Sequence, residues 1–274
     1  MFTSILVLLI LSTELTRVEL FRDISYAEER GADPEKHKLD LYLPQQHCNY
    51  PVLVFVHGVG WSHGDKNYWF DLYGKLGQAI AKQGIGVAVI NYRLSPHVKN
   101  PEQAFDVAQA IKWVHRNISN YGGNLENLFL AGHSAGGQLV SLVATDPTYL
   151  ARKDMRITDI RGVISISGVY DVTDNNLIFE RVFGKETYKR ELCSPIHHVK
   201  EGLPPFLILH AERELPYCDG ACATHFYQKL KTCQVPCQIV PVSRRDHMSI
   251  LACMTEVNDP ALQVILQFIH KRKQ

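Results

Sequence analysis

Short apolar runs alternate along the chain with stretches in which apolar residues recur at helical spacing. The apolar runs lie at 38–43, 52–56, 86–92, 127–132, 162–168, 206–211 and 237–242, and the helical stretches at 69–82, 104–114, 135–145, 222–232 and 261–269. The middle runs are apolar throughout, which is typical of strands that are covered on both faces. This alternation predicts an α/β fold with a mostly parallel central sheet and helices on both faces.

The first run, "KLDLYL" at 38–43, alternates apolar with polar residues instead. We therefore expect it to form an antiparallel edge strand with one wetter face. No repeat, low-complexity tract or linker-like segment divides the remainder of the chain. Residues 21–274 are accordingly predicted to form a single domain.

Residues 1–20 contain an apolar run from Ile5 to Leu11. Its length suits the apolar region of a signal peptide and falls short of the about 20 residues that a membrane span needs. The segment has no Lys or Arg before this run, so an apolar helix docked on the core is the alternative. Seven cysteines and the sequon Asn117-Ile118-Ser119 favour an oxidising compartment. We expect secretion or residence in the endoplasmic reticulum lumen, with the cytoplasm as the alternative.

Cysteines and charge narrow the possible ligands. Cys218, Cys222, Cys233 and Cys237 form two C-x3-C pairs, a layout that superficially resembles a zinc site. Cys237 opens an apolar run that suits a core strand better than a zinc knuckle, so disulfides or buried thiols are favoured and no metal is predicted. A formal net charge of +1, with charges scattered along the chain, gives no indication of nucleic-acid binding.

One serine stands between a predicted strand and a predicted helix, in the sequence Gly132-His133-Ser134-Ala135-Gly136. A tight strand-turn-helix of the form G-x-S-x-G exposes a serine hydroxyl at a helix N-terminus, where backbone N–H groups stabilise negative charge. A small-residue turn without chemistry is the plainer alternative. The flanking elements favour a nucleophile at Ser134.

A serine nucleophile needs a base and an acid that orients the base, and in this architecture they follow in the order serine, carboxylate, histidine. His247 lies in a loop between the last predicted strand and the final helix, which makes it the candidate base. Glu214 and Glu212 both follow the strand at 206–211, and Glu214 is favoured because it lies farther into the loop. Asp246 is interpreted as a loop carboxylate, because adjacent side chains rarely reach each other.

The oxyanion that forms during such chemistry needs N–H donors. They are expected from Ala135, directly after the nucleophile, and from the glycine-rich loop that follows the strand at 52–56. That loop has the sequence "HGVGW" at 57–61, and a glycine-rich turn with the tryptophan packed on it is the alternative.

From about residue 36 onward the chain resembles the α/β-hydrolase superfamily, specifically the esterases that carry an HGGGW or HGGxW loop. The resemblance is carried, in family order, by "LDLYLP", "HGVGW" followed by "GDK", "NYRLSP", "YGGN", "GHSAGG", "SPIHHV", "FLILHAERE" and "DHMSI". This group includes carboxylesterases, arylformamidases, feruloyl-type esterases and prenylcysteine methylesterases. The resemblance implies an α/β-hydrolase fold, an ester substrate of small to medium size and no cofactor. It implies Ser134, His247 and Glu214 as the triad and the amides of Gly58, Val59 and Ala135 as the oxyanion hole.

Three positions depart from the family pattern. Val59 replaces a glycine, and because β-branched residues disfavour positive φ, the loop is expected to change geometry or to narrow the acyl pocket. Ala211 replaces a frequent glycine, and Glu214 replaces the usual aspartate. The alternatives to an esterase are an arylformamidase-type amide hydrolase with the same triad and a catalytically silent binding module. Residues 146–160 and 171–200 are expected to cover the site and to set substrate size.

Overall fold

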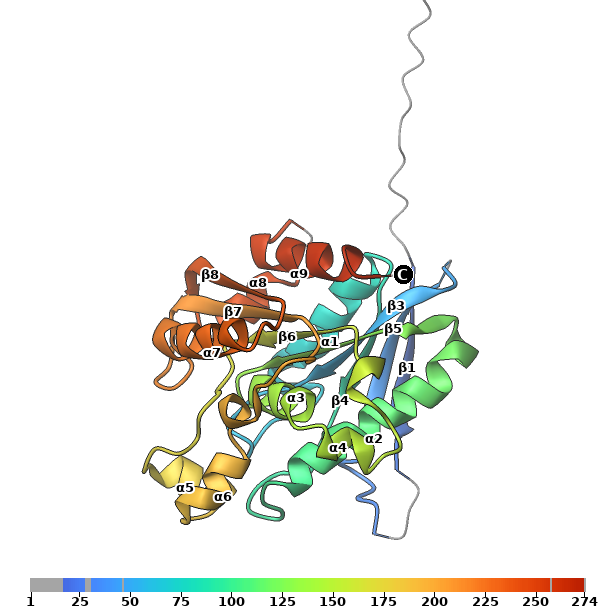
Figure 1. Ribbon diagram of the computed structural model, residues 1–274. Helices are drawn as coiled ribbons and strands as arrows, with labels where there is room; N and C mark the ends of the chain where they lie inside the picture. The colour runs from blue at the N-terminus through green and yellow to red at the C-terminus, as the bar shows by residue number, and fades with distance from the viewer. Residues whose placement is uncertain (1–16, 28–30, 46, 257, 274) are drawn as a thin grey trace, which may run out of the picture.

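The computed structural model describes residues 17–27, 31–45, 47–256 and 258–273, and these form a central sheet between two layers of helices (Figure 1). Within these residues eight strands lie in the order β1-β2-β4-β3-β5-β6-β7-β8. The strands are β1 Val18–Ser25, β2 Lys38–Pro44, β3 Tyr50–Val56, β4 Gly86–Ile90, β5 Gly123–His133, β6 Gly162–Ile166, β7 Phe206–Arg213 and β8 Cys237–Asp246. The predicted α/β-hydrolase type of sheet is confirmed.

Strands β4, β3, β5, β6, β7 and β8 pair in parallel, whereas β1 and β2 are antiparallel to their neighbours. The register brings several strand ends level, because Val56 pairs with Gly132 and Arg213 pairs with Asp246. Loops that follow β3, β5, β7 and β8 therefore leave the sheet at one common edge, where ligands bind in such folds.

All seven predicted runs form strands, but the prediction for the first of them is wrong in two respects. Strand β2 is antiparallel as expected, yet β1 pairs along its outer side, so β1 is the edge. No wetter face exists on β2, since every residue after Lys38 in the strand is buried. The predicted boundary after residue 20 falls inside β1, and the signal-peptide prediction otherwise concerns residues 1–16, which lie outside the described residues.

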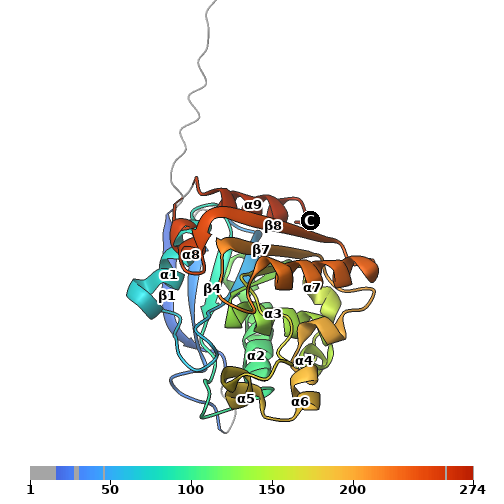
Figure 2. The ribbon, with the colours of Figure 1, turned by 90° about the vertical axis from the view of Figure 1, so that its left-hand side faces the viewer.

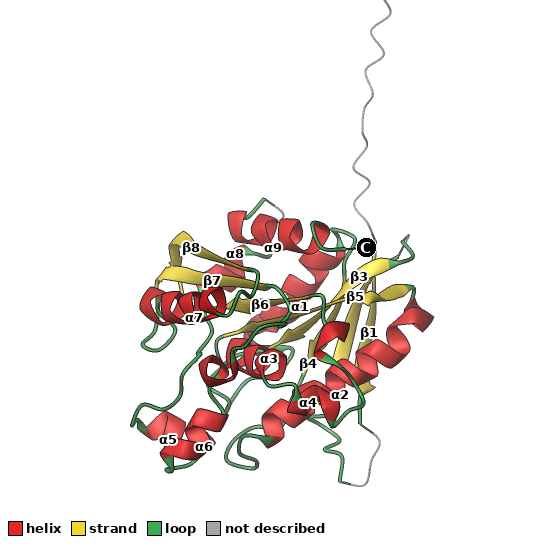
Figure 3. Cartoon of the chain, in the orientation of Figure 1, coloured by secondary structure: helices red, strands yellow, loops and turns green. Residues whose placement is uncertain are grey.

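Helices cover both faces of the sheet, and each predicted helical stretch is confirmed. The helices α1 Tyr68–Ala81, α8 Ser249–Cys253 and α9 Pro260–His270 pack on one face, while α2 Glu102–Asn117, α3 Ala135–Thr145 and α7 Gly220–Thr232 pack on the other. Figure 2 shows α8 and α9 on the opposite side of β7 and β8 from α7, and Figure 3 shows the strands between the two helical layers. Two separate apolar clusters, one on each face, form the core.

Short helices occupy stretches where the sequence showed no clear period. They are α4 Thr148–Ala151, α5 Leu177–Phe183, α6 Thr187–Leu192 and the 3₁₀ turns η1 Ile118–Tyr121, η2 Ile157–Asp159 and η3 Pro195–His198. Helix α6 is held by the fully buried Arg190, whose guanidinium donates to the backbone carbonyls of Thr173, Gly184 and Lys185. A single buried cation thus organises the loop between β6 and β7.

Of the two alternatives for the cysteines, the structure shows thiols rather than disulfides: all seven lie in the described part of the chain and are free, with Cys193 and Cys218 buried. Among the residues that the structure describes, no cluster of three or more His, Cys, Asp or Glu side chains could hold a metal ion. Asn117 of the sequon ends α2, and its side-chain amide donates to the Trp113 carbonyl. No helix in the described ranges is both long and apolar enough to cross a membrane.

Candidate active site

Ser134 lies at the sharp turn between β5 and α3 with φ 55° and ψ −118°, a strained conformation for a residue other than glycine. The turn closes because its flanking glycines approach backbone directly. A Cβ on Gly132 would lie 2.2 Å from the Gly136 carbonyl oxygen, and a Cβ on Gly136 would lie 2.1 Å from the Val56 carbonyl oxygen. These contacts explain why the motif has glycine at both positions, and they confirm the predicted strand-turn-helix around Ser134.

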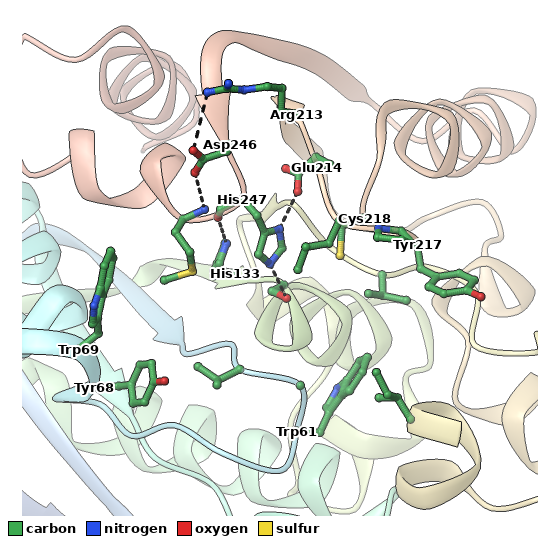
Figure 4. A pocket seen from close by; sticks show the side chains of 18 of the residues that line it. Trp61, Tyr68, Trp69, His133, Arg213, Glu214, Tyr217, Cys218, Asp246 and His247 are labelled. Atoms are coloured by element: carbon green, nitrogen blue, oxygen red, sulfur yellow. Dashed lines mark hydrogen bonds and ion pairs between the residues drawn. The ribbon is translucent and has the colours of Figure 1, made fainter. Parts of the chain in front are cut away.

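His247 directly follows β8 and is only 8% exposed. Its Nε2 lies 3.0 Å from the Ser134 hydroxyl, and its Nδ1 lies 2.6 Å from a carboxylate oxygen of Glu214 (Figure 4). The three side chains come from the ends of β5, β7 and β8 and form one hydrogen-bonded chain. The structure therefore brings together the three residues that the sequence singled out.

Glu214, rather than Glu212, faces the imidazole. One Glu214 oxygen bonds His247, while the other accepts from the Ala211 amide at 2.8 Å and from the Ser167 hydroxyl. Glu212 points elsewhere and accepts from the Arg244 amide at 2.7 Å. Three donors fix the Glu214 carboxylate, so the longer side chain in place of the family's aspartate still reaches the base.

Ser167 was not singled out from the sequence, although "GVISISG" places it at the end of a strand beside β7. Asp246 ends β8 instead of lying in a loop, and Glu214 rather than Asp246 bonds the His247 ring, as expected. Asp246 accepts from the amides of Met248 and Ser249 at the start of α8 and lies 3.8 Å from Arg213, and it makes no contact with the His247 ring.

Two further histidines, His133 and His57, are buried beside the site. His133 Nε2 lies 2.9 Å from the His247 carbonyl oxygen, and the two rings lie 4.7 Å apart. Burial lowers the pKa of His133 to about 3, with the nearby His247 adding to the effect, and burial lowers the pKa of His57 to about 4. Both rings are therefore neutral at pH 7. His133 anchors the backbone of the base to the elbow that carries the nucleophile.

The loop after β3 lies beside Ser134, but one of its amides has a different partner from the one expected. Val59 has a positive φ of 75°, a conformation that β-branched residues disfavour. Val59 and Gly60 line the pocket beside Ser134. Gly58, one of the predicted oxyanion donors, instead donates its N–H to the Tyr73 hydroxyl at 2.9 Å. Ala135 begins α3 directly after the nucleophile, as predicted.

An ion-pair cluster fixes the far end of this loop. Lys66 is almost fully buried, and its ammonium lies 2.8 Å from Asp23 on β1 and 2.9 Å from Asp40 on β2. The Lys66 amide also donates to the Asn91 side chain at 2.6 Å. The "GDK" sequence thereby ties the loop to the antiparallel end of the sheet.

A cavity of about 690 Å³ opens above Ser134 and His247. Its walls are mainly apolar and come from the loop after β3, the start of α1, helix α5 and the loop after β7; they include Trp61, Tyr68, Trp69, Val169, Ile178, Phe179, Leu215, Pro216, Tyr217, Cys218 and Met248 (Figure 4). Residues 171–200 therefore do contribute to the site, through α5. Residues 146–160 contribute none of the lining, so that part of the expectation is wrong.

The rim of this cavity exposes large apolar side chains. Trp69, at the start of α1, lines the cavity and is 47% exposed, and the next residue, Phe70, is 84% exposed; both have left-handed φ values. Ile178 and Leu215 are also exposed, from α5 and the loop after β7. The mouth of the cavity is therefore apolar.

The sheet order, the serine elbow and the hydrogen-bonded serine, histidine and glutamate define the fold class as that of the α/β hydrolases. A family model described as BD-FAE matches residues 39–229, and the chain belongs to this family.

Several curated proteins and solved structures are similar to the chain. It is 35% identical over 181 residues to esterase LipC of Mycobacterium tuberculosis, covering 60% of this chain and 44% of LipC. It is 27% identical over 246 residues to isoprenylcysteine alpha-carbonyl methylesterase ICME of Arabidopsis thaliana, covering 80% of this chain and 55% of ICME. The chain thus spans about half the length of these relatives. A truncated carbohydrate esterase from gut microbiota shares the fold with a TM-score of 0.78 at 18% identity, over 95% of this chain and 98% of that chain.

Proposed function

We propose that the chain is a serine esterase that hydrolyses carboxylic esters through an acyl-enzyme on Ser134. The observation that carries this proposal is the continuous hydrogen-bonded chain from the Ser134 hydroxyl through His247 to Glu214. The esterase names of the curated relatives and of the similar structures support it.

In the first half of the reaction the Ser134 oxygen attacks the ester carbonyl while His247 Nε2 accepts the serine proton. His247 then delivers this proton to the leaving alkoxide, which departs as the alcohol and leaves the acyl group on the serine. Water, deprotonated by the same nitrogen, attacks the acyl-enzyme and releases the acid. Glu214 holds the Nδ1 proton and stabilises the imidazolium that forms in each half.

Negative charge develops on the carbonyl oxygen during both attacks. The Val59 and Ala135 amides are the proposed backbone donors, since they flank Ser134 from the loop after β3 and from the N-terminus of α3. The N-terminus of α3 also contributes a favourable dipole. The Gly58 amide is not included, because the Tyr73 hydroxyl already accepts its hydrogen.

The cavity indicates the class of ester. At about 690 Å³ with aromatic and aliphatic walls, it suits a small to medium ester with at least one apolar group. Burial of apolar substrate surface contributes about 25 cal/mol per Å², so an apolar acyl or alcohol group would provide most of the binding energy.

The test is labelling with a fluorophosphonate followed by mass spectrometry. Wild-type protein should gain one adduct, located on Ser134, and Ser134→Ala should gain none. Ser243→Ala, which alters an exposed serine on β8, is the matched control and should label like wild type. Absence of an adduct on folded wild-type protein would indicate a silent binding module.

Steady-state kinetics distinguish an esterase from a formamidase. The chain should hydrolyse p-nitrophenyl esters, with rates that rise as the acyl chain lengthens until the cavity is filled, and should act more slowly on N-formylkynurenine. Glu214→Gln should lower kcat by about 10³- to 10⁴-fold, because an amide neither holds the correct tautomer nor stabilises the imidazolium. Faster turnover of N-formylkynurenine than of any ester would overturn the assignment to esters.

A further inference from the structure

Tyr73 is a buried residue of the active-site wall with no role in the triad. It lies in the second turn of α1, is 1% exposed and lines the cavity above Ser134. Its ring packs 5.9 Å from the Phe55 ring and 6.0 Å from the His57 ring, centroid to centroid. Close packing on two sides fixes the direction in which its hydroxyl points.

The hydroxyl bonds the loop that packs against Ser134, and both residues line the same cavity. Its oxygen is 2.9 Å from the Gly58 nitrogen. Gly58 itself touches the elbow, because a Cβ at this position would lie 3.1 Å from the Ser134 Cβ and 2.9 Å from the His133 carbonyl oxygen. Gly58 thus contacts the phenol through its amide and the elbow through its Cα, on the side of the cavity formed by the loop after β3.

The hydrogen bond from Gly58 determines which part of the Tyr73 hydroxyl remains available to a ligand. The backbone N–H donates and the phenolic oxygen accepts, so the phenolic hydrogen is left without an acceptor among the described residues. Burial raises the pKa of Tyr73 to about 12, with the Gly58 hydrogen bond acting in the opposite direction, so the hydroxyl carries its proton at neutral pH. An oxygen that accepts one hydrogen bond also becomes a better donor of its own hydrogen.

We propose that the Tyr73 hydroxyl donates a hydrogen bond to the oxyanion that forms when Ser134 attacks the substrate carbonyl. This inference rests on the proposed esterase function. The Gly58 amide then donates to the phenol rather than to the substrate. Tyr73 supplies the third donor to the oxyanion, beside the amides of Val59 and Ala135. The proton stays on the tyrosine throughout, so no covalent bond to Tyr73 forms or breaks.

The direct test compares Tyr73→Phe with Tyr92→Phe. Tyr92 is the matched control, since its buried hydroxyl also bonds the same loop, at the His57 carbonyl, and its ring stacks on His57 at 4.5 Å, but it does not line the cavity. Tyr73→Phe should lower kcat for a p-nitrophenyl ester by about 10²-fold with little change in KM, because loss of one oxyanion donor has this effect. Tyr92→Phe should lower it less than about 10-fold, the effect of a looser loop without a lost donor.

Two inhibitors distinguish a hydroxyl that donates to the oxyanion from one that only shapes the cavity. A trifluoromethyl ketone forms a hemiketal oxyanion on Ser134, whereas the product alcohol binds without one. Tyr73→Phe should weaken the ketone by the same factor as kcat and leave the alcohol affinity within about 2-fold of wild type. Equal weakening of both inhibitors would show that Tyr73 only shapes the cavity and would overturn the proposal.

A second variant keeps the test decisive if Tyr73→Phe folds poorly. Replacing Tyr73 with 3-fluorotyrosine retains the hydroxyl and lowers its pKa, so activity should fall at a less alkaline pH than in wild type, because a phenolate cannot donate. The other titratable groups near this hydroxyl are His57, Tyr68 and Tyr92, which the replacement leaves unchanged. An unchanged alkaline limb would count against the donor role.

The two proposals fail in different ways. If wild-type protein takes up no fluorophosphonate on Ser134, the esterase function itself is refuted. If wild type labels and turns over while Tyr73→Phe matches Tyr92→Phe in kcat and in ketone affinity, only the role of Tyr73 is refuted.

Discussion

Acid should destabilise the fold well above the pH at which carboxylates protonate, because two imidazoles are buried in neutral form. Burial holds the pKa of His57 at about 4 and that of His133 at about 3, against 6.5 for an exposed imidazole. Below pH 6.5 the unfolded chain therefore binds a proton at each position that the folded chain does not bind. Their contribution to stability is complete above pH 6.5 and is lost as the pH falls towards these lowered values.

The magnitude follows from linkage. Each proton that only the unfolded state binds lowers the free energy of unfolding by about 1.4 kcal/mol per pH unit. Over the two pH units from 6.5 to 4.5 the pair together should remove about 5 kcal/mol, a large share of the about 5 to 15 kcal/mol that stabilises a typical domain.

Carboxylates affect the stability of the fold in a lower pH range. Burial opposes ionisation of Asp106, but hydrogen bonds from His37 and Arg93 outweigh it and hold the pKa of this carboxyl below 3.8. Its contribution is present above pH 3.8 and is lost as the pH falls further. The interval from pH 6 to 4.5 therefore lies above the range in which Asp106 titrates.

Urea unfolding followed by tryptophan fluorescence at several pH values between 7 and 4.5 measures this slope. His57→Gln and His133→Gln should each flatten it by about 1.4 kcal/mol per pH unit, since each removes one titrating group. Equal slopes in wild type and both variants would refute the reasoning, as would an NMR titration in which the buried His133 ring protonates near pH 6.5.

Three substitutions test the packing of the site. Val59→Gly should raise stability by about 1 kcal/mol in a thermal melt, because it relieves a β-branched residue at φ 75°, and Val59→Ala should gain less; no gain from glycine would contradict the strain. Gly136→Ala should lower the free energy of unfolding in urea by at least about 1 kcal/mol and abolish ester hydrolysis, since its Cβ would meet the Val56 carbonyl oxygen at 2.1 Å; retained activity would contradict this contact. Lys66→Met should cost about 3 to 5 kcal/mol in urea unfolding by leaving the buried Asp40 without its ammonium partner, and a loss below about 1 kcal/mol would show that Asp40 is not dependent on it.

The sequence predicted those parts of the fold whose cause is local. Continuous apolar runs mark strands buried on both faces, and glycine spacing marks the elbow at Ser134. Strand β1 was missed because it is short of apolar residues and only partly buried, so its place depends on pairing with β2 rather than on its own pattern. Secretion stays a prediction, because the signal-like run lies outside the described residues.

The site was predictable in its residue types but not in its fine hydrogen bonding. The order of serine, acid and base placed Ser134, Glu214 and His247 correctly at strand ends. The family resemblance implied the Gly58 amide as an oxyanion donor, whereas its observed acceptor, Tyr73, lies on a helix 15 residues away and no local signal links the two. Contacts between a loop and a distant helix appear only once the chain is folded.

The base of this site is secured from both ends. The carbonyl of His247 is held by His133 on the elbow, and its ring is held by Glu214 at the end of β7. A loop histidine restrained in this way needs only a small rotation of its ring to move from the serine to the departing alcohol. The hydroxyl, imidazole and carboxylate are thus aligned in the free chain, and the proposed chemistry requires no rearrangement of the backbone.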